Sequence, residues 1–170
     1  MGARALRALA LVAVALTALA APAVAAAPHV PTSGTFVPGE SLGGVRLGMT
    51  KAEVVALWGA RHGVCRGCER TTWYFNLKPF EPQGAGVELR NGRVSRVFTL
   101  WRPLGWRTDG GLELGVQTDR LLAAHPELTN RGCAGYQAYV EPGRATSAYY
   151  VFRGRLWGFG LTRAGSSPCL

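Results

Sequence analysis

Beyond residue 40 the chain carries two apolar stripes with the spacing of a helix. The first lies between Thr50 and Gly59, and its apolar residues recur at helical intervals. Thr50 and Glu53 have the spacing of a capping box, in which the threonine caps free backbone N–H groups and the glutamate reaches back. The second stripe lies between Gln117 and Pro126 and lacks the capping glutamate. These stripes predict two helices, of which the second is the weaker.

Each predicted helix is followed by segments rich in β-branched and aromatic residues, the composition typical of strands. The dipeptides Asn91-Gly92 and Arg153-Gly154 separate the last two segments of each set, and Asn-Gly tolerates the positive φ angles of a two-residue hairpin turn. Each set therefore predicts a three-stranded antiparallel meander. The predicted strands are Thr71–Leu77, Gly86–Arg90 and Arg93–Trp101 in the first set, and Tyr136–Val140, Thr146–Phe152 and Leu156–Thr162 in the second.

The two sets share landmarks that indicate an internal repeat. Gly44–Met49 matches Gly111–Val116 ahead of each helix, and a turn glycine, Gly92 or Gly154, precedes the last strand of each meander. Neither unit alone buries enough apolar surface to be stable, so we expect the two to share a core, with their sheets side by side or face to face. The pattern predicts an α+β fold of two tandem helix-plus-meander repeats, 40–104 and 105–170, with the helices packed on one side of an antiparallel sheet.

The last predicted strand has two unlike faces. Alternation places Trp157, Phe159 and Leu161 on one face, and Gly158 and Gly160 on the other. A face of glycines lacks side chains, so it leaves room for a helix to approach closely.

The N-terminal residues have the layout of a secretory signal peptide. Arg4 and Arg7 precede an Ala/Leu/Val run that is shorter than the roughly 20 apolar residues of a membrane span. We place the cleavage after Ala25, followed by a flexible, proline-containing lead-in over 26–39. The alternative is an uncleaved anchor helix. The prediction is a secreted or extracytoplasmic protein with no transmembrane segment in its mature chain.

The segment Leu47–Val54, with Gly-Met-Thr opening a helix, resembles the repeat of the secreted actinobacterial β-lactamase inhibitor proteins. It is more distantly similar to the outer-membrane assembly lipoproteins of the BamE (SmpA/OmlA) type. The resemblance covers 44–101 and, more faintly, 111–162, where Gly115-Val116-Gln117 departs from the motif. It implies helices packed on one antiparallel sheet whose open, concave face binds another protein. The contacting loops of the inhibitors have no residue-by-residue match, so β-lactamase inhibition is not transferred.

Four cysteines in an exported chain predict two disulfides. We favour Cys65–Cys68 and Cys133–Cys169 among the three possible pairings. The Cys-x-x-Cys spacing of the first pair also allows thiol-redox chemistry or, with His62, a zinc site. However, the motif follows a predicted helix, whereas reactive pairs open one, where the helix N-terminus lowers the thiol pKa. A structural role is therefore the favoured interpretation, and no metal ligand is assigned.

The remaining residues give no catalytic constellation. His29, His62 and His125 lie in the lead-in or at helix ends, and no serine stands in a nucleophile elbow. No glycine-rich loop leads from a strand into a helix to cradle phosphate. We therefore predict a non-enzymatic protein without a cofactor, and the rival interpretation is an exported thiol-redox protein or other small enzyme using Cys65 and Cys68.

Aromatic and arginine side chains offer the better clue to function, because tyrosine, tryptophan and arginine dominate protein-binding hot spots. Most aromatic residues fall on predicted strands and are expected in the core, but a subset with neighbouring arginines can line an exposed sheet face. The segment 101–107 is the first candidate, although it also reads as an ordered linker. The candidate binding residues are Trp101, Arg102, Trp106, Arg107, Tyr74 and Tyr150.

The net charge of +9 comes almost entirely from arginine, since Lys51 and Lys78 are the only lysines. A basic surface attracts anionic partners such as envelope polymers, lipid head groups or acidic proteins. Nucleic acid fits this charge but not the predicted compartment. The sequence thus predicts a binding module that recognises an extracytoplasmic protein or an anionic envelope polymer through its sheet face.

Overall fold

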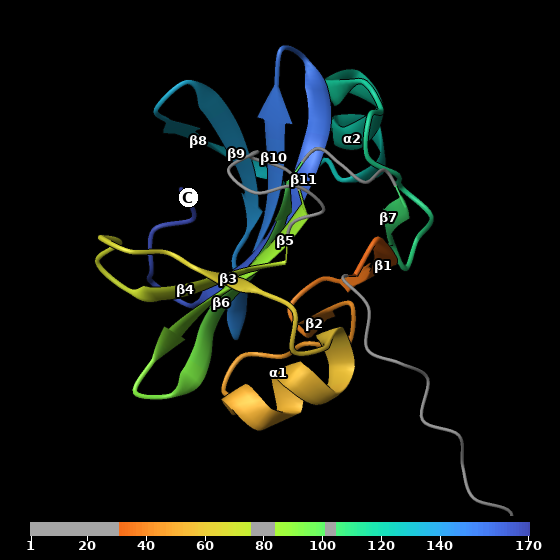
Figure 1. The fold of residues 1–170 in the computed structure, drawn as a ribbon. Helices are drawn as coiled ribbons and strands as arrows, with labels where there is room; N and C mark the ends of the chain where they lie inside the picture. The colour runs from red at the N-terminus through yellow and green to blue at the C-terminus, as the bar shows by residue number, and fades with distance from the viewer. Residues whose placement is uncertain (1–30, 76–83, 101–104) are drawn as a thin grey trace, which may run out of the picture.

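The computed structural model describes residues 31–75, 84–100 and 105–170. Their main feature is an eight-stranded sheet in which all neighbouring strands are antiparallel (Figure 1). The order across the sheet is β3 (Gly63–Val64), β4 (Thr71–Phe75), β5 (Gly84–Arg90), β6 (Arg93–Leu100), β11 (Arg155–Arg163), β10 (Ala145–Phe152), β9 (Tyr136–Glu141) and β8 (Thr129–Cys133).

A smaller sheet contains three strands, β2 (Ser41–Leu42), β1 (Ser33–Val37) and β7 (Gly105–Thr108), with β1 in the middle. β1 runs antiparallel to β2 and parallel to β7. Phe36 of β1 is fully buried and its ring stacks on that of Phe159, 5.1 Å away. Residues 33–37 fall in the predicted lead-in, and in the structure they contribute a strand and a core side chain.

Two short helices complete the described structure, α1 (Lys51–Trp58) and α2 (Thr118–Ala124). The capping box at the start of α1 is present in both directions, between Thr50 and Glu53. α2 begins without a side-chain cap. Each helix buries few side chains, chiefly Val54 and Trp58 in α1 and Leu121 in α2.

The fold-class prediction of an α+β protein built from two tandem helix-plus-meander repeats is wrong. The described residues are mostly β, with eleven strands against two helices of 8 and 7 residues. The strands expected in two separate meanders belong to one continuous sheet, because β6 pairs with β11 from Arg96↔Thr162 to Phe98↔Gly160. Both central strands are buried along nearly their whole length, because two clusters of apolar side chains cover their two faces.

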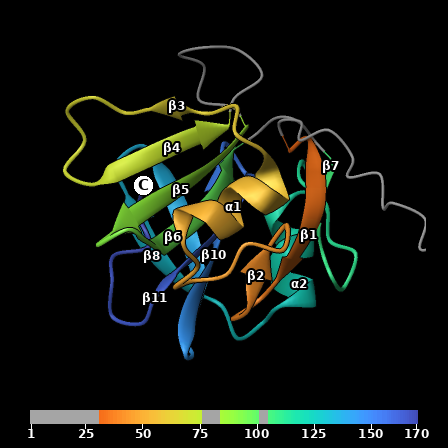
Figure 2. The same ribbon diagram turned by 60° about the horizontal axis from the view of Figure 1, so that its bottom comes forward.

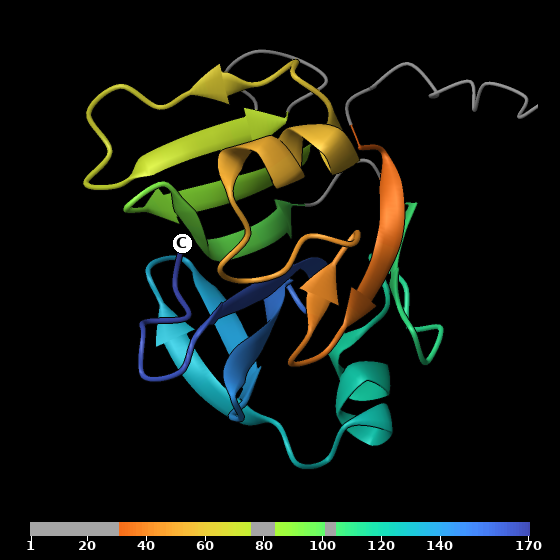
Figure 3. The ribbon, with the colours of Figure 1, turned by 90° about the horizontal axis from the view of Figure 1, so that it is seen from below.

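The large sheet has two unlike faces, which we name inner and outer. The two helices and the small sheet cover the inner face (Figures 2 and 3), where most buried apolar side chains form one core that includes Val54, Trp106 and Leu121. The outer face carries a smaller cluster centred on Phe98 and Tyr150. The inner face therefore supplies most of the packing, and the outer face is where aromatic side chains lie near solvent.

Candidate functional site

The β10–β11 hairpin sends an aromatic side chain to the outer face through an irregularity in its register. Tyr150 pairs with Gly158, whereas the next residue, Val151, pairs with Leu156. Trp157 is therefore an extra residue, as in a β-bulge, and a bulge re-aims the side chains beside it. Trp157 consequently packs on the outer cluster, while Phe159 lies in the inner core. The prediction that Trp157 shares a face with Phe159 and Leu161 is therefore wrong, because the bulge turns Trp157 to the opposite face.

Four aromatic residues gather at this end of the outer face, and we call them the outer aromatic cluster: Tyr136, Tyr150, Phe152 and Trp157. The Trp157 ring lies 5.7 Å from that of Tyr136, 6.0 Å from that of Phe152 and 6.4 Å from that of Tyr150. Tyr150 is buried, Tyr136 and Trp157 are half-buried, and Phe152 is 41% exposed. The cluster thus has a buried residue, Tyr150, at its base and an exposed apolar side chain, Phe152, at its edge.

Glycines on the strand beneath make room for the base of this cluster. A Cβ atom at Gly160 would overlap the Tyr150 hydroxyl, whereas one at Gly158 would overlap the Thr99 carbonyl oxygen and would lie 3.1 Å from the Tyr150 ring. The sequence predicted open room on this glycine face for a helix. In the structure the room is filled by the side chain of Tyr150.

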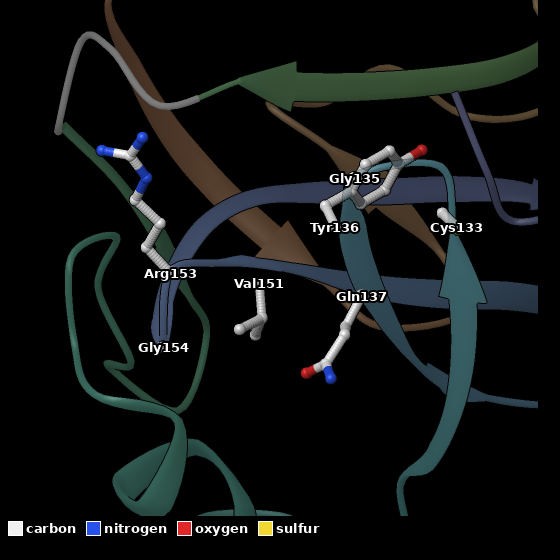
Figure 4. A pocket seen from close by; sticks show the side chains of 7 residues that line it. All are labelled: Cys133, Gly135, Tyr136, Gln137, Val151, Arg153 and Gly154. Atoms are coloured by element: carbon white, nitrogen blue, oxygen red, sulfur yellow. The ribbon is translucent and has the colours of Figure 1, made fainter.

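A pocket of about 410 Å³ adjoins the cluster between two hairpin turns (Figure 4). Gly135 lies in the turn between β8 and β9, and Arg153 and Gly154 form the turn between β10 and β11. Figure 4 shows the side chains of Arg153 and Tyr136 extending to one side of the strands, and those of Val151 and Gln137 to the other. The remaining described lining residue is Cys133. The pocket therefore shares Tyr136 with the outer aromatic cluster, whereas Phe152 and Trp157 are not among its described lining residues.

Arg153 contributes the charge at this site. Among the described residues that line the pocket it is the only charged one. Its guanidinium carbon lies 5.1 Å from the centre of the Phe152 ring, within the range of a cation–π contact. The guanidinium is thereby held next to the exposed aromatic side chain.

The middle of the outer face carries a second, more buried charged group. Arg96 is 4% exposed and donates from one nitrogen to Glu88 at 2.8 Å and from another to the Ser167 carbonyl at 2.6 Å. Glu88 also pairs with Arg70 at 2.9 Å. Arg96 is thus already paired and covered, so its guanidinium is not available at the surface.

The C-terminal segment lies against this same face. Tyr150 donates its hydroxyl proton to the Pro168 carbonyl at 3.0 Å, and the Leu170 N–H donates to the Tyr136 hydroxyl. Burial raises the pKa of both tyrosines above the ordinary value of a tyrosine hydroxyl. The Cys133–Cys169 disulfide fastens the segment to β8. The chain terminus therefore covers the buried base of the cluster and leaves Phe152 exposed.

The disulfides follow the pairing expected from the sequence, Cys65–Cys68 and Cys133–Cys169. Two disulfides fit a chain that works in an oxidising, extracytoplasmic compartment. The Cys65–Cys68 pair lies between the short edge strand β3 and β4, after α1 has ended, and not at the start of a helix. That surrounding lacks the helix N-terminus that lowers the pKa of reactive thiols.

The structure places the candidate binding residues in different surroundings. Trp101 and Arg102 lie outside the described residues. Trp106 is fully buried beside Trp58, with ring centres 6.0 Å apart, so it belongs to the inner core, whereas the neighbouring Arg107 is exposed on β7. Of the candidate binding residues in 101–107 that the structure describes, Arg107 alone is exposed.

Tyr74 and Tyr150 both lie on the outer face, as alternation along their strands requires. Tyr74 is half-buried, with its ring 6.1 Å from that of Phe98, and Tyr150 is the base of the outer aromatic cluster. Sequence reasoning did not single out Phe152, Arg153 or Trp157 as a site. The Arg153-Gly154 turn was the available signal, because it fixes where Phe152 leaves its strand.

The described residues contain no group of three or more histidine, cysteine or acidic residues able to hold a metal ion. His62 stacks on Trp73 with ring centres 3.9 Å apart, and burial lowers the pKa of its imidazole. No helix in the described ranges is long and apolar enough to cross a membrane.

No family model and no curated protein matches this sequence. A solved structure with detectable similarity is that of an extracellular protein containing a SCP domain from Bacillus anthracis str. Ames, with a TM-score of 0.47 and 12% sequence identity. The match covers 69% of this chain and 44% of that chain. The chain thus spans less than half the length of that protein, and a similarity at this level carries no inference about function.

Proposed function

We propose that this protein is an exported, non-enzymatic binding module that recognises another protein outside the cytoplasm through the outer face of its large sheet. The observation that carries the proposal is the exposed Phe152 ring beside half-buried Trp157 and next to Arg153, which together with Tyr136 lines a pocket of about 410 Å³. Large exposed apolar side chains that gather at a hollow are typical of interaction sites. A leader over residues 1–25 would deliver the chain to the compartment that its two disulfides fit.

The composition of the site favours a protein as the partner. Tryptophan, tyrosine and arginine are enriched among the residues that dominate protein-binding energies, and hot spots cluster where a buried base supports a few exposed anchors. Tyr150 supplies such a base, because it is 1% exposed and hydrogen-bonded to the C-terminal segment. Phe152 and Arg153 supply the exposed anchors.

The test is an affinity capture from the culture fluid and envelope of the native organism, followed by binding measurements with the purified partner. The bait is the mature protein, compared with Phe152→Ser on the outer face. Leu57→Ser is the matched control, because Leu57 is 50% exposed on α1, which covers the inner face. We expect Phe152→Ser to weaken binding of the purified partner at least tenfold, while Leu57→Ser binds like the parent.

Equal binding by the parent and by Phe152→Ser, with loss in Leu57→Ser, would move the site to the helix side and overturn the proposal. Capture of an envelope polymer by parent and both variants alike would replace protein recognition by charge-driven adhesion.

A further inference from the structure

Two hairpin turns of the large sheet, between β5 and β6 and between β10 and β11, have nearly the same backbone but different residues at their first position. In the turn between β5 and β6, Asn91 and Gly92 have φ angles of 53° and 73°. In the turn between β10 and β11, Arg153 and Gly154 have 48° and 73°. Asparagine and glycine are the residues that this two-residue turn favours. In the left-handed conformation the Cβ of any residue but glycine crowds the following carbonyl oxygen. Asparagine offsets this cost with local hydrogen bonds from its short polar side chain, and arginine does not.

Arg153 is thus an exception to the preference for asparagine or glycine, which Asn91 satisfies in a turn of the same geometry. Backbone strain of this kind tends to persist where a side chain is needed for function. The same side chain is the only charged one among the described residues that line the pocket, and it rests 5.1 Å from the centre of the Phe152 ring. Arg153 therefore combines an unfavourable backbone conformation with a charged side chain that lines the pocket.

The chemistry of Arg153 defines what it can recognise. A guanidinium presents a planar fork of N–H donors that matches the two oxygens of a carboxylate. Exposed Phe152, whose ring centre lies 5.1 Å from the guanidinium carbon, and half-buried Trp157 beside Phe152 offer an apolar surface. The site is thus complementary to an acidic residue that neighbours an apolar one.

We propose that Arg153 determines the specificity of this face by pairing with a carboxylate on an acidic peptide segment of the partner protein, while a neighbouring apolar side chain of that segment packs on Phe152 and Trp157. This inference rests on the proposed function and narrows it to a partner chemistry. The carboxylate pairs with the guanidinium where the latter lies next to the exposed Phe152 ring.

The probe is a displayed library of random peptides selected on the full-length protein in its disulfide-bonded form. We expect the selected peptides to share an aspartate or glutamate next to an apolar residue, and replacement of that acid by its amide to weaken binding at least tenfold. Arg153→Asn is expected to weaken binding of the selected peptides by a similar factor. Its midpoint of thermal unfolding is expected to be equal to or higher than that of the parent, because Asn-Gly suits the turn.

Two matched controls separate charge, turn geometry and recognition. Arg144→Asn removes the same charge at an exposed position between β9 and β10 and is expected to bind like the parent. Asn91→Arg places arginine in the other turn and is expected to lower the unfolding midpoint without changing binding.

The two proposals fail in different ways. If the selected peptides lose affinity for Phe152→Ser but bind Arg153→Asn like the parent, the binding face stands and the carboxylate inference is overturned. If no peptide is enriched, or if the enriched peptides bind both variants like the parent, both proposals are overturned. A drop in the unfolding midpoint of Arg153→Asn would refute the argument from backbone strain, because the side chain would then have a structural reason to be there.

Discussion

Glycines decide where aromatic side chains lie on the outer face. Gly86 lies under Phe98, and Gly160 lies under Tyr150, because a Cβ atom at either position would overlap the aromatic side chain above it. Phe98 and Tyr150 are 3% and 1% exposed, so the missing Cβ atoms allow both side chains to be buried against the sheet. The outer face is therefore built from pairs of glycine and aromatic residues on neighbouring strands.

Gly160→Ala tests this arrangement at a single residue. The added methyl group would meet the Tyr150 hydroxyl, which is itself held by Pro168. Overpacking of a well-filled site costs about 1–3 kcal/mol, so we expect the free energy of unfolding to fall by that amount in urea denaturation. Gly132→Ala on the edge strand β8 is the control, since a Cβ there meets nothing within 4 Å. Equal effects of the two substitutions would contradict the packing argument.

The alternating pattern of the sequence identified the glycine face of β11 but not its occupant. Local alternation gives the side of a strand on which a residue lies, and it carries no information about the neighbouring strand. The Tyr150↔Gly158 pairing arises between β10 and β11 and depends on the bulge at Trp157. A bulge has no fixed signature in side-chain pattern, which is why Trp157 was expected on the wrong face.

At the scale of single elements, the sequence was most informative where a side chain forms a hydrogen bond with a free backbone N–H group nearby. The Thr50 hydroxyl accepts from the Glu53 N–H at 3.3 Å, and the Glu53 carboxylate accepts from the Thr50 N–H at 2.6 Å. The capping box predicted for α1 is therefore confirmed. The hydrogen bonds from Thr50 also hold the pKa of the Glu53 carboxyl below its ordinary value.

Thr50→Ala removes the cap of α1 while leaving its buried side chains in place. Loss of an N-cap costs about 1 kcal/mol, and we expect that decrease in the free energy of unfolding, measured by chemical denaturation at neutral pH. Thr50→Ser keeps the hydroxyl and is expected to lie close to the parent. If the serine variant lost as much stability as the alanine variant, the methyl group rather than the cap would be responsible.

Elements without such local signals were not predictable. β8 reads Thr-Asn-Arg-Gly-Cys, is largely exposed, and shows no alternation of apolar and polar residues. It is a strand because it pairs with β9 along its length and forms the edge of the sheet. β1 likewise depends on a parallel partner, β7, that lies some seventy residues further along the chain. Pairing over such distances leaves no trace in a local window of sequence.

At the scale of the whole molecule, the predicted architecture failed because it gave the helices too large a share of the fold. The predicted strand Arg93–Trp101 contains β6 (Arg93–Leu100), but the sequence left side-by-side and face-to-face sheets both open, and only the pairing of β6 with β11 decides between them. The same limit applies to the candidate site. Tyr150 was identified from composition, whereas its neighbours Phe152 and Arg153 became a site only when the turn, the bulge and β9 came together.

The C-terminal segment is held to the whole sheet by one covalent link and a few hydrogen bonds. Ser167 and Pro168 accept hydrogen bonds from Arg96 and Tyr150, and Cys169 is bonded to Cys133 across 36 positions of the chain. The Cys65–Cys68 disulfide spans 3 positions and joins neighbouring parts of one loop. The two bonds therefore restrict the unfolded chain to very different extents.

The chain-entropy model converts this difference into a prediction for the two double variants. Closing the longer loop stabilises the fold by about 3–4 kcal/mol, and closing the shorter loop by about 2 kcal/mol. We expect Cys133→Ser/Cys169→Ser to lose more free energy of unfolding than Cys65→Ser/Cys68→Ser, measured in urea under identical conditions. Equal losses of free energy in the two double variants would contradict the chain-entropy argument and would mean that the hydrogen bonds from Arg96 and Tyr150 hold the C-terminal segment without the disulfide.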